Sequence, residues 1–155
     1  MKILDFLFPP RCCNCQTLLK RHYPLCKECQ SHIELASIEV QSCSYRAIHC
    51  FDHLSPIKSL HSKACHPSVA KLMAAFLIVQ LNHLSHEPID SVYILNSRSK
   101  PLATYCARFL KLPLNRKAYE RCILVPSIHP MTPKEKRRLA AKYPRALIHI
   151  SLYQF

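Results

Sequence analysis

The stretch that decides the fold is IDSVYILNSRSKPLATYCARFL, residues 89–110. Residues 89–95 are an almost continuous β-branched and aromatic run, which is typical of a strand buried on both faces. Ser99 can cap the helix that follows, and Pro101 is tolerated in its first turn. The apolar face expected for this helix holds Leu102, Cys106, Phe109 and Leu110. A strand, a short loop and a helix make half of a βαβ unit, so this stretch predicts an α/β fold.

The sequence on either side extends this pattern. Residues 44–54 alternate in part and predict a strand that Pro56 ends. Ser68 can then cap a long helix. Its apolar positions recur at the helical period: Val69, Leu72, Met73, Phe76, Leu77, Leu81 and Leu84. Residues 132–135, TPKE, form a capping box that opens a helix to Tyr143, and residues 146–155 predict a closing strand. We therefore expect one α/β domain over residues 43–155.

Residues 1–42 hold most of the cysteines. Cys12 and Cys15 form one Cys-x-x-Cys pair, and Cys26 and Cys29 form a second pair after ten intervening residues. Each pair can bind a metal ion from a tight turn, and four thiolates around one ion is the arrangement of structural zinc. A closed four-sulfur shell leaves no position for a substrate, so such a site is structural rather than catalytic. Because residues 1–42 are short of apolar mass, we expect a zinc-ribbon-like lobe that one structural Zn²⁺ ion stabilises.

Two other states of these cysteines stay open. The ten cysteines also fit a disulfide scaffold, and an iron–sulfur cluster takes the same four ligands. The absence of an export signal favours reduced thiols, and with them zinc. Cys13 could replace Cys12 as a ligand. The remaining cysteines are expected to be small core residues: Cys43, Cys50, Cys65, Cys106 and Cys122.

The composition excludes several classes of function. The chain of 155 residues contains no Gly. Walker loops, dinucleotide-binding turns, nucleophile elbows and EF-hand loops need Gly where the backbone takes a positive φ or approaches a phosphate. The longest apolar stretch, residues 69–84, is interrupted by polar residues and is shorter than a membrane span of about 20 residues. We expect no membrane span and, without a signal peptide, a cytoplasmic protein.

The formal net charge is +13, and most of it lies toward the C-terminus. Residues 96–145 contain 13 Lys and Arg against only Glu120 and Glu135. Cations that neutralise phosphates, next to tyrosines that stack on bases, are typical of single-strand nucleic-acid binding. The candidate binding residues are Arg98, Lys100, Lys134, Lys136, Arg137, Arg138, Lys142 and Arg145, with Tyr105, Tyr119 and Tyr143 as stacking candidates. The alternative is a solvated basic face without a ligand.

Several of these segments resemble the ComF family of bacterial competence-associated proteins. Residues 8–15, FPPRCCNC, followed by Leu25, Cys26 and Cys29, resemble the N-terminal zinc lobe of that family. Residues 55–60, SPIKSL, are similar to the segment that leads into its first long helix. Residues 89–100 resemble its first phosphoribosyltransferase-like strand and basic loop, and residues 133–143 resemble the basic helix before its phosphate-binding loop. The resemblance implies a phosphoribosyltransferase-like α/β domain next to the zinc lobe.

The residues that bind phosphoribosyl pyrophosphate in this family have no counterpart in the sequence. The family uses an acidic pair and a Thr/Gly-rich loop after the strand that residues 146–152 match. Neither feature is present in the residues from 146 to Phe155. Without those carboxylates and backbone amides, nothing would bind the 5′-phosphate or Mg²⁺. We therefore expect a shortened homologue with an incomplete, or truncated, phosphoribosyltransferase-like domain and no catalysis.

The expected function is binding. The protein would bind single-stranded DNA, or a protein partner of the DNA-uptake machinery. Two alternatives stay open: a phosphoribosyltransferase with an atypical active site, and a zinc lobe that acts as a protein-docking module.

Overall fold

The computed structural model describes residues 9–21, 23–33, 38–42, 45–51, 60, 63–64, 66–82, 88–114, 122–142 and 147–153. Within these residues a five-stranded sheet has the order β1-β2-β5-β4-β3. Its strands are β1 (Ile38–Ser42), β2 (Tyr45–Phe51), β3 (Ser91–Val92), β4 (Ile123–Ser127) and β5 (Leu147–Tyr153). β1 pairs antiparallel with β2, and all other neighbours pair in parallel. The predicted α/β class is therefore confirmed, and β1, from the residues assigned to the N-terminal lobe, forms one edge of the sheet.

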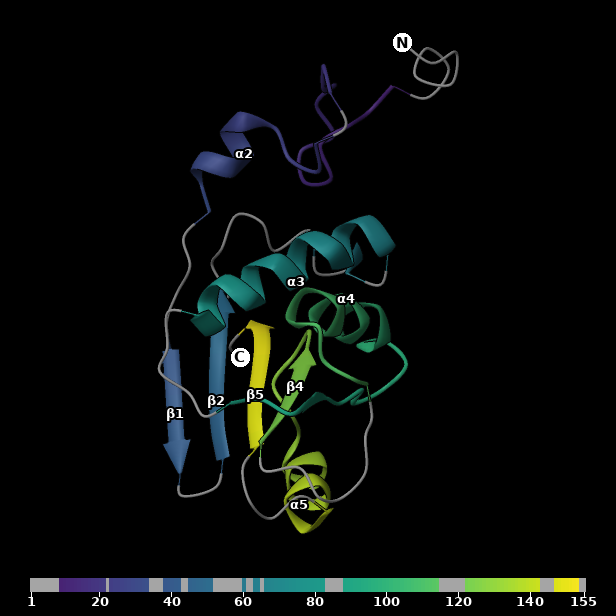
Figure 1. Ribbon diagram of the computed structural model, residues 1–155. Coiled ribbons are helices and arrows are strands. Elements are labelled where there is room, and N and C mark those ends of the chain that lie inside the picture. The colour runs from purple at the N-terminus through teal and green to yellow at the C-terminus, as the bar shows by residue number, and fades with distance from the viewer. Residues whose placement is uncertain are drawn as a thin grey trace.

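Helices cover both faces of this sheet. α3 (Pro67–Asn82) and α4 (Lys100–Leu110) pack together in the main core with β2, β4 and β5. α5 (Pro133–Lys142) places Leu139 against Ile123 and Val125, which project from the opposite face of β4 to Leu124. The short α2 (Lys27–Ser31) belongs to the cysteine lobe, residues 9–33. Figure 1 shows this lobe beside α3 at one end of the molecule and α5 at the other end.

The long predicted helices form close to their expected bounds. In α3 the predicted core positions Val69, Met73, Leu77 and Leu81 are all buried. The capping box of α5 also forms. The Thr132 amide donates to Glu135 Oε2 at 2.9 Å, and the Glu135 amide donates to Thr132 Oγ1 at 3.2 Å. The 3.6-residue period therefore placed α3, and the capping box placed the start of α5. The prediction that Ser68 caps α3 is wrong, because α3 begins at Pro67 and Ser68 lies inside its first turn.

Two details of α4 differ from the prediction. Ser99 precedes the helix as expected, but its hydroxyl makes no capping bond and donates instead to the Asn96 carbonyl at 3.0 Å. Leu102 and Cys106 are buried, whereas Phe109 is 42% exposed. The prediction that Phe109 belongs to the buried face is wrong, because Phe109 lines a hollow beside the cysteine lobe together with Tyr23, whereas Leu110 of the same turn packs against the main core.

The strands were predicted less well. The segments 44–54 and 146–155 contain β2 and β5, but only Ser91–Val92 of residues 89–95 is a strand. β4, with the sequence ILVPS, was not predicted at all. β3 pairs with Ile123 and Leu124 but no further along β4, so Pro126 lies where β5 is the only described neighbour of β4. Proline is tolerated at such a position because its missing N–H interrupts no hydrogen-bonded ladder.

A polar cluster lies within the sheet. His49 Nδ1 is 2.5 Å from Ser151 Oγ, and His149 Nε2 is 2.7 Å from Ser127 Oγ. Burial lowers the pKa of His49, and burial together with the nearby His49 lowers the pKa of His149 to about 3. Both imidazoles are therefore neutral at physiological pH.

Candidate metal centre and basic surface

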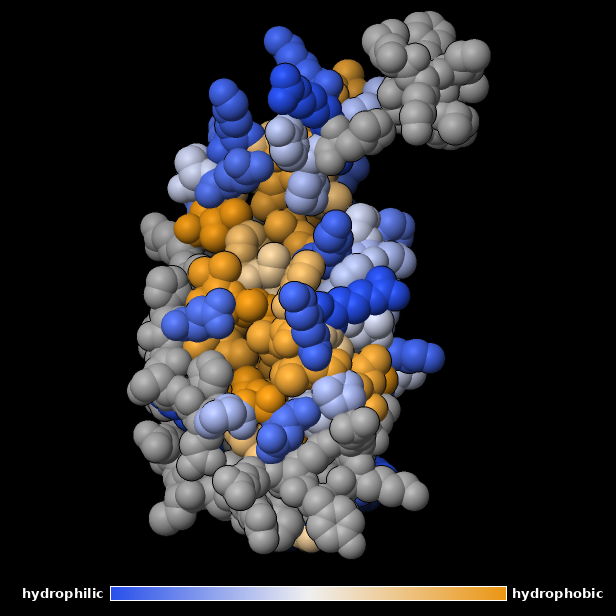
Figure 2. Space-filling view, viewed as in Figure 1, coloured by the Kyte–Doolittle hydropathy of each residue, from blue (hydrophilic) through white to orange (hydrophobic). Residues whose placement is uncertain are grey.

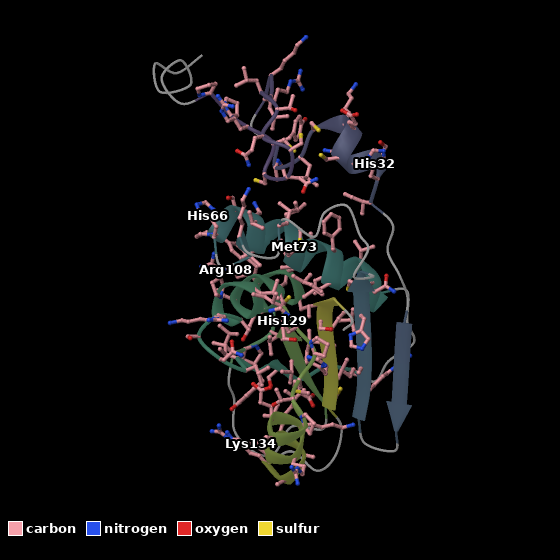
Figure 3. The ribbon with its side chains drawn as sticks, turned by 180° about the vertical axis from the view of Figure 1, so that it is seen from behind. His32, His66, Met73, Arg108, His129 and Lys134 are labelled. Carbon is pink, nitrogen blue, oxygen red and sulfur yellow. The ribbon has the colours of Figure 1, made fainter. Side chains whose placement is uncertain are left out.

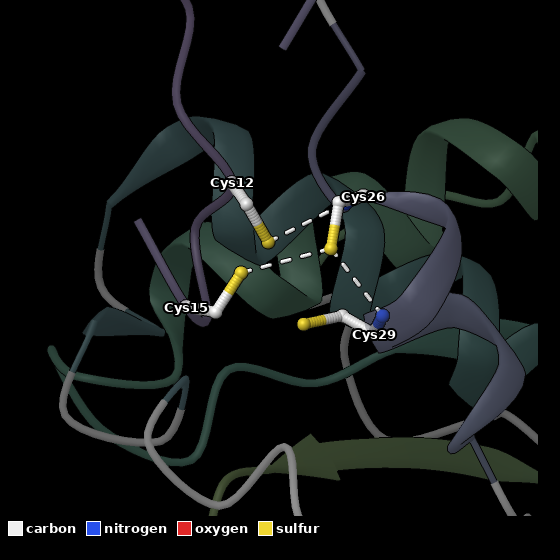
Figure 4. A group of neighbouring side chains, drawn as sticks. All are labelled: Cys12, Cys15, Cys26 and Cys29. Atoms are coloured by element: carbon white, nitrogen blue, oxygen red, sulfur yellow. Dashed lines mark hydrogen bonds between the residues drawn. The ribbon is translucent and has the colours of Figure 1, made fainter. Parts of the chain in front are cut away.

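The four predicted ligands lie together in the cysteine lobe. Cys12 and Cys15 come from one tight turn, Cys26 is the N-cap residue of α2, and Cys29 lies within that helix. Their sulfur atoms all lie within 4.8 Å of one another. Figure 4 shows the four side chains grouped together. Cys12 and Cys29 are buried, whereas Cys15 is exposed. The sequence spacing thus predicted the one four-cysteine cluster found among the described residues.

Backbone and side-chain donors surround these sulfur atoms. The Cys26 amide donates to Cys12 Sγ and the Cys29 amide donates to Cys26 Sγ, each at 3.4 Å. Asn14 Nδ2 donates to Cys29 Sγ, also at 3.4 Å. Donors that point at ligand atoms orient them and favour the deprotonated form that binds metal. The local turns therefore prepare the sulfur atoms as ligands.

The geometry fits one metal ion. A tetrahedron of metal–sulfur bonds about 2.3 Å long has sulfur–sulfur edges of about 3.8 Å. Cys15 Sγ and Cys26 Sγ are 3.6 Å apart. All four thiols are free in the structure, with no disulfide between them. The cluster is therefore compatible with a bound metal ion in a closed, four-sulfur shell.

The thiol pKa values explain why a cation suits this cluster. The Thr17 hydroxyl and amide lower the pKa of Cys15 to about 6. For Cys29, the Asn14 amide lowers the pKa, but burial and the three neighbouring cysteines raise it to about 12. The thiols cannot all ionise at neutral pH while they are so close together. A divalent metal ion removes this conflict, because it compensates the negative charge of the thiolates.

The other cysteines lie elsewhere. Cys13 is not in the cluster, and its carbonyl accepts a hydrogen bond of 3.0 Å from Lys63 Nζ, which ties the cysteine lobe to the segment before α3. Cys50, Cys106 and Cys122 are buried in the main core, as predicted. Cys43 and Cys65 lie outside the described residues.

The predicted basic residues fall into two groups. Most of them are on α5, where Lys134, Arg137, Arg138 and Lys142 are exposed and Lys136 is half-buried. Figure 3 shows Lys134 at the opposite end of the molecule from His32, which follows α2. Arg98 and Lys100 lie at the start of α4, and Arg145 is outside the described residues. The sequence thus located a basic helix, and the structure places it far from the cysteine lobe.

A pocket of about 350 Å³ lies between the loop before α4 and the start of α5, and Arg98 is the one candidate basic residue among the described residues that line it. It lies at the carboxyl ends of β3 and β4 and is lined by residues that include Arg98, Ser127, His129 and Glu135. Burial and the charge of Arg98 lower the pKa of His129. Arg98 is therefore brought to the start of α5, whereas Lys100 does not line this pocket.

Aromatic side chains lie beside both α5 and α4. Beside α5, Lys142 Nζ is 5.2 Å from the centroid of the Tyr93 ring. The stacking candidate Tyr105 lies on α4, with its ring 6.4 Å from that of Phe109 and the Arg108 guanidinium 5.6 Å above it. Tyr119 and Tyr143 lie outside the described residues. Phe109 and Tyr23, which were not among the predicted stacking candidates, are 42% and 56% exposed. The signal for Tyr23 was its position between two cysteine pairs, directly after a basic run.

The fold and this cluster define an α/β protein with a mostly parallel sheet and an N-terminal four-cysteine lobe. No protein-family model matches the chain, and no curated protein matches it. No helix within the described residues is long and apolar enough to cross a membrane.

Proposed function

We propose that this chain is a ComF-like protein in which one structural zinc ion stabilises the N-terminal lobe and a basic surface binds single-stranded nucleic acid. The four sulfur atoms within 4.8 Å of one another carry the first half of this proposal. The motif FPPRCCNC and the Cys-x-x-Cys spacing support the likeness to ComF. The second half rests on the concentration of cations on α5.

Zinc is the metal that this donor set favours. Four thiolates in a tetrahedral shell suit zinc or an iron–sulfur cluster, and a single metal ion needs no inorganic sulfide. Elemental analysis of the purified chain should find about one zinc per chain and no iron. Iron together with a visible sulfur-to-iron absorption band would overturn the assignment of zinc.

The charges on α5 support a ligand that carries phosphates. Glu135 is the only acidic residue of this helix, and its carboxylate is occupied in the capping box with Thr132. The exposed cations Lys134, Arg137 and Arg138 therefore face solvent without an acidic residue on the same helix to neutralise them. A polyanion that binds there would release counterions, so its affinity would fall steeply with salt.

A salt titration tests the nucleic-acid half. The zinc-loaded chain should bind a fluorescent single-stranded oligonucleotide, and replacement of Lys136, Arg137 and Arg138 by Ala should weaken binding and flatten its salt dependence. The matched control changes the same three positions to Arg, Lys and Lys, which keeps their charge and should keep the salt slope. Unchanged binding by the triple Ala variant would refute a binding surface on α5.

A phosphoribosyltransferase is the second candidate. The observation in its favour is the pocket at the carboxyl ends of β3 and β4, where parallel sheets commonly bind their ligands. Incubation with phosphoribosyl pyrophosphate, Mg²⁺ and nucleobases tests it. Turnover that Arg98→Ala abolishes would favour the enzyme over the binding protein.

A further inference from the structure

A second surface, separate from the basic helix α5, lies on the cysteine lobe. It consists of two hollows that share the side chain of Tyr23. One, of about 560 Å³, lies between the lobe and α3 and α4, and the other, of about 800 Å³, lies on the lobe itself. Tyr23 lines both hollows, and the two hollows together are called the Tyr23 groove.

The groove combines exposed aromatic rings with apolar walls. Tyr23 and Phe109 both line the first hollow, and both keep about half of their side chains exposed. Leu18 lies in the second hollow and is 58% exposed. Figure 2 shows apolar side chains in a band that begins at the cysteine lobe and continues over α3, with hydrophilic side chains projecting beside it. Exposed rings in a hollow provide flat surfaces on which another planar group can stack.

The charged residues of the groove all have one sign. Arg11 and Lys71 line the first hollow, and Lys20, Arg21 and Lys27 line the second. No Asp or Glu is among the described residues that line either hollow. The occupant that complements this lining must offer negative charge at regular intervals and planar apolar groups between them. A single nucleic-acid strand has this alternation, with phosphates for the cations and bases for the rings.

We infer that the Tyr23 groove binds the bases of a single nucleic-acid strand, with Tyr23 and Phe109 as stacking residues and the surrounding cations on the phosphates. This inference rests on the proposed function, and it places the base contacts in the Tyr23 groove. The groove binds bases through their faces, without hydrogen-bonding specificity. The cations of α5, at the other end of the molecule, would contact further phosphates of the strand.

Two strands of the same charge separate these contributions. The full metal-loaded chain is titrated with a fluorescent oligothymidylate of about 12 nucleotides and with an abasic strand of the same length. Stacking should make the oligothymidylate bind at least about fivefold more tightly, which is the lower end of one base–aromatic stack. The variant Tyr23→Leu/Phe109→Leu should reduce this ratio to about one while leaving the affinity for the abasic strand unchanged.

The controls keep the test independent of folding and of α5. Val79→Ala removes an exposed apolar side chain of α3 outside both hollows, so it should leave the ratio unchanged. The triple Ala variant of α5 should weaken both strands equally. If the double variant loses its metal, Tyr23→Leu alone is used. Replacing this one exposed side chain should still lower the ratio of the two affinities.

Each contrary outcome identifies what failed. A strong preference for oligothymidylate that the Leu variants do not change would overturn the Tyr23 groove and leave the proposed function standing. No binding of either strand would overturn both. Equal affinity for the two strands, with displacement by polyglutamate, would overturn the inference in favour of an acidic peptide as occupant.

Discussion

The cysteine lobe and the sheet are stabilised by different interactions. Among its described residues, the lobe buries only Cys12, Leu25 and Cys29, which adjoin the core of α3 and α4, and two of the three belong to the metal centre. The sheet instead packs α3 and α4 against a large apolar core on one face and α5 on the other. Metal–ligand bonds must therefore replace most of the missing apolar burial in the lobe, whereas the sheet can persist without metal.

The largest effect expected from this difference is the loss of the metal. Cys15→Ser removes one ligand at an exposed position and should reduce the bound metal from about one ion per chain to none, because a structural zinc site contributes about 10–16 kcal/mol of binding free energy. Hydrogen exchange should then show open amides in the cysteine lobe and protected amides in β2, β4 and β5. Cys13→Ser, next to the cluster but outside it, is the control and should keep the metal. Loss of protection throughout the sheet would contradict independent stabilisation.

The converse change acts on the sheet. Ile150 is fully buried in the central strand β5, so Ile150→Ala should lower the free energy of unfolding by about 2–5 kcal/mol. Ile150→Val removes less volume and should cost about 0.5–1.5 kcal/mol. Denaturant unfolding measures both variants, and metal analysis should find the ion still bound in native conditions. Metal release by Ile150→Val would show that the lobe depends on the packing of β5.

The two regions also differed in how far the sequence could predict them. The metal cluster was recoverable because two Cys-x-x-Cys pairs specify a local geometry that does not depend on the rest of the fold. α3 and α5 were recoverable because periodicity and capping are also local. The four-cysteine cluster and the two helices are therefore confirmed, whereas zinc binding and nucleic-acid binding stay predictions.

The errors arose where partners distant in sequence decide the structure. β4 contains Pro126, which the sequence alone marks as a strand breaker, and only the early end of β3 makes that position acceptable. Phe109 has the spacing of a core residue, but it lines a hollow together with Tyr23, about 86 positions earlier in the chain. Helical spacing predicts which residues share a face and does not say how much of that face other elements cover.

Acid should destabilise the sheet, because β5 buries His149. His149 has a pKa of about 3 in the folded chain and an ordinary value near 6.5 when unfolded. Between these values the unfolded state binds more protons, so stability falls as the pH is lowered through 6.5 toward 3. At about pH 5 the loss from this group is about 2 kcal/mol.

A variant isolates the contribution of this histidine. His149→Gln keeps a hydrogen-bonding group near Ser127 but cannot be protonated, so the free energy of unfolding should change much less between about pH 7 and pH 5. Urea unfolding at several pH values measures the slope. An equal slope in both proteins would assign the acid sensitivity to other groups, such as His49.

The smallest expected effects come from the two described residues that take a positive φ without being Gly, and they compare the regions most directly. Lys111 ends α4 at φ 56°, and Gln16 follows the first cysteine pair at φ 65°. Gly has no Cβ and so avoids the steric cost of a positive φ, although its greater freedom in the unfolded chain cancels part of this gain. Lys111→Gly should therefore stabilise the sheet by about 0.5–1 kcal/mol.

Gln16→Gly should have the same local effect in the lobe. This effect should appear as tighter metal binding rather than as a higher melting temperature, because metal ligation and not apolar burial holds the lobe together. Thermal unfolding and competition with a chelator measure the two quantities separately. A rise in melting temperature from Gln16→Gly as large as that from Lys111→Gly would mean that the lobe and the sheet unfold as a single unit.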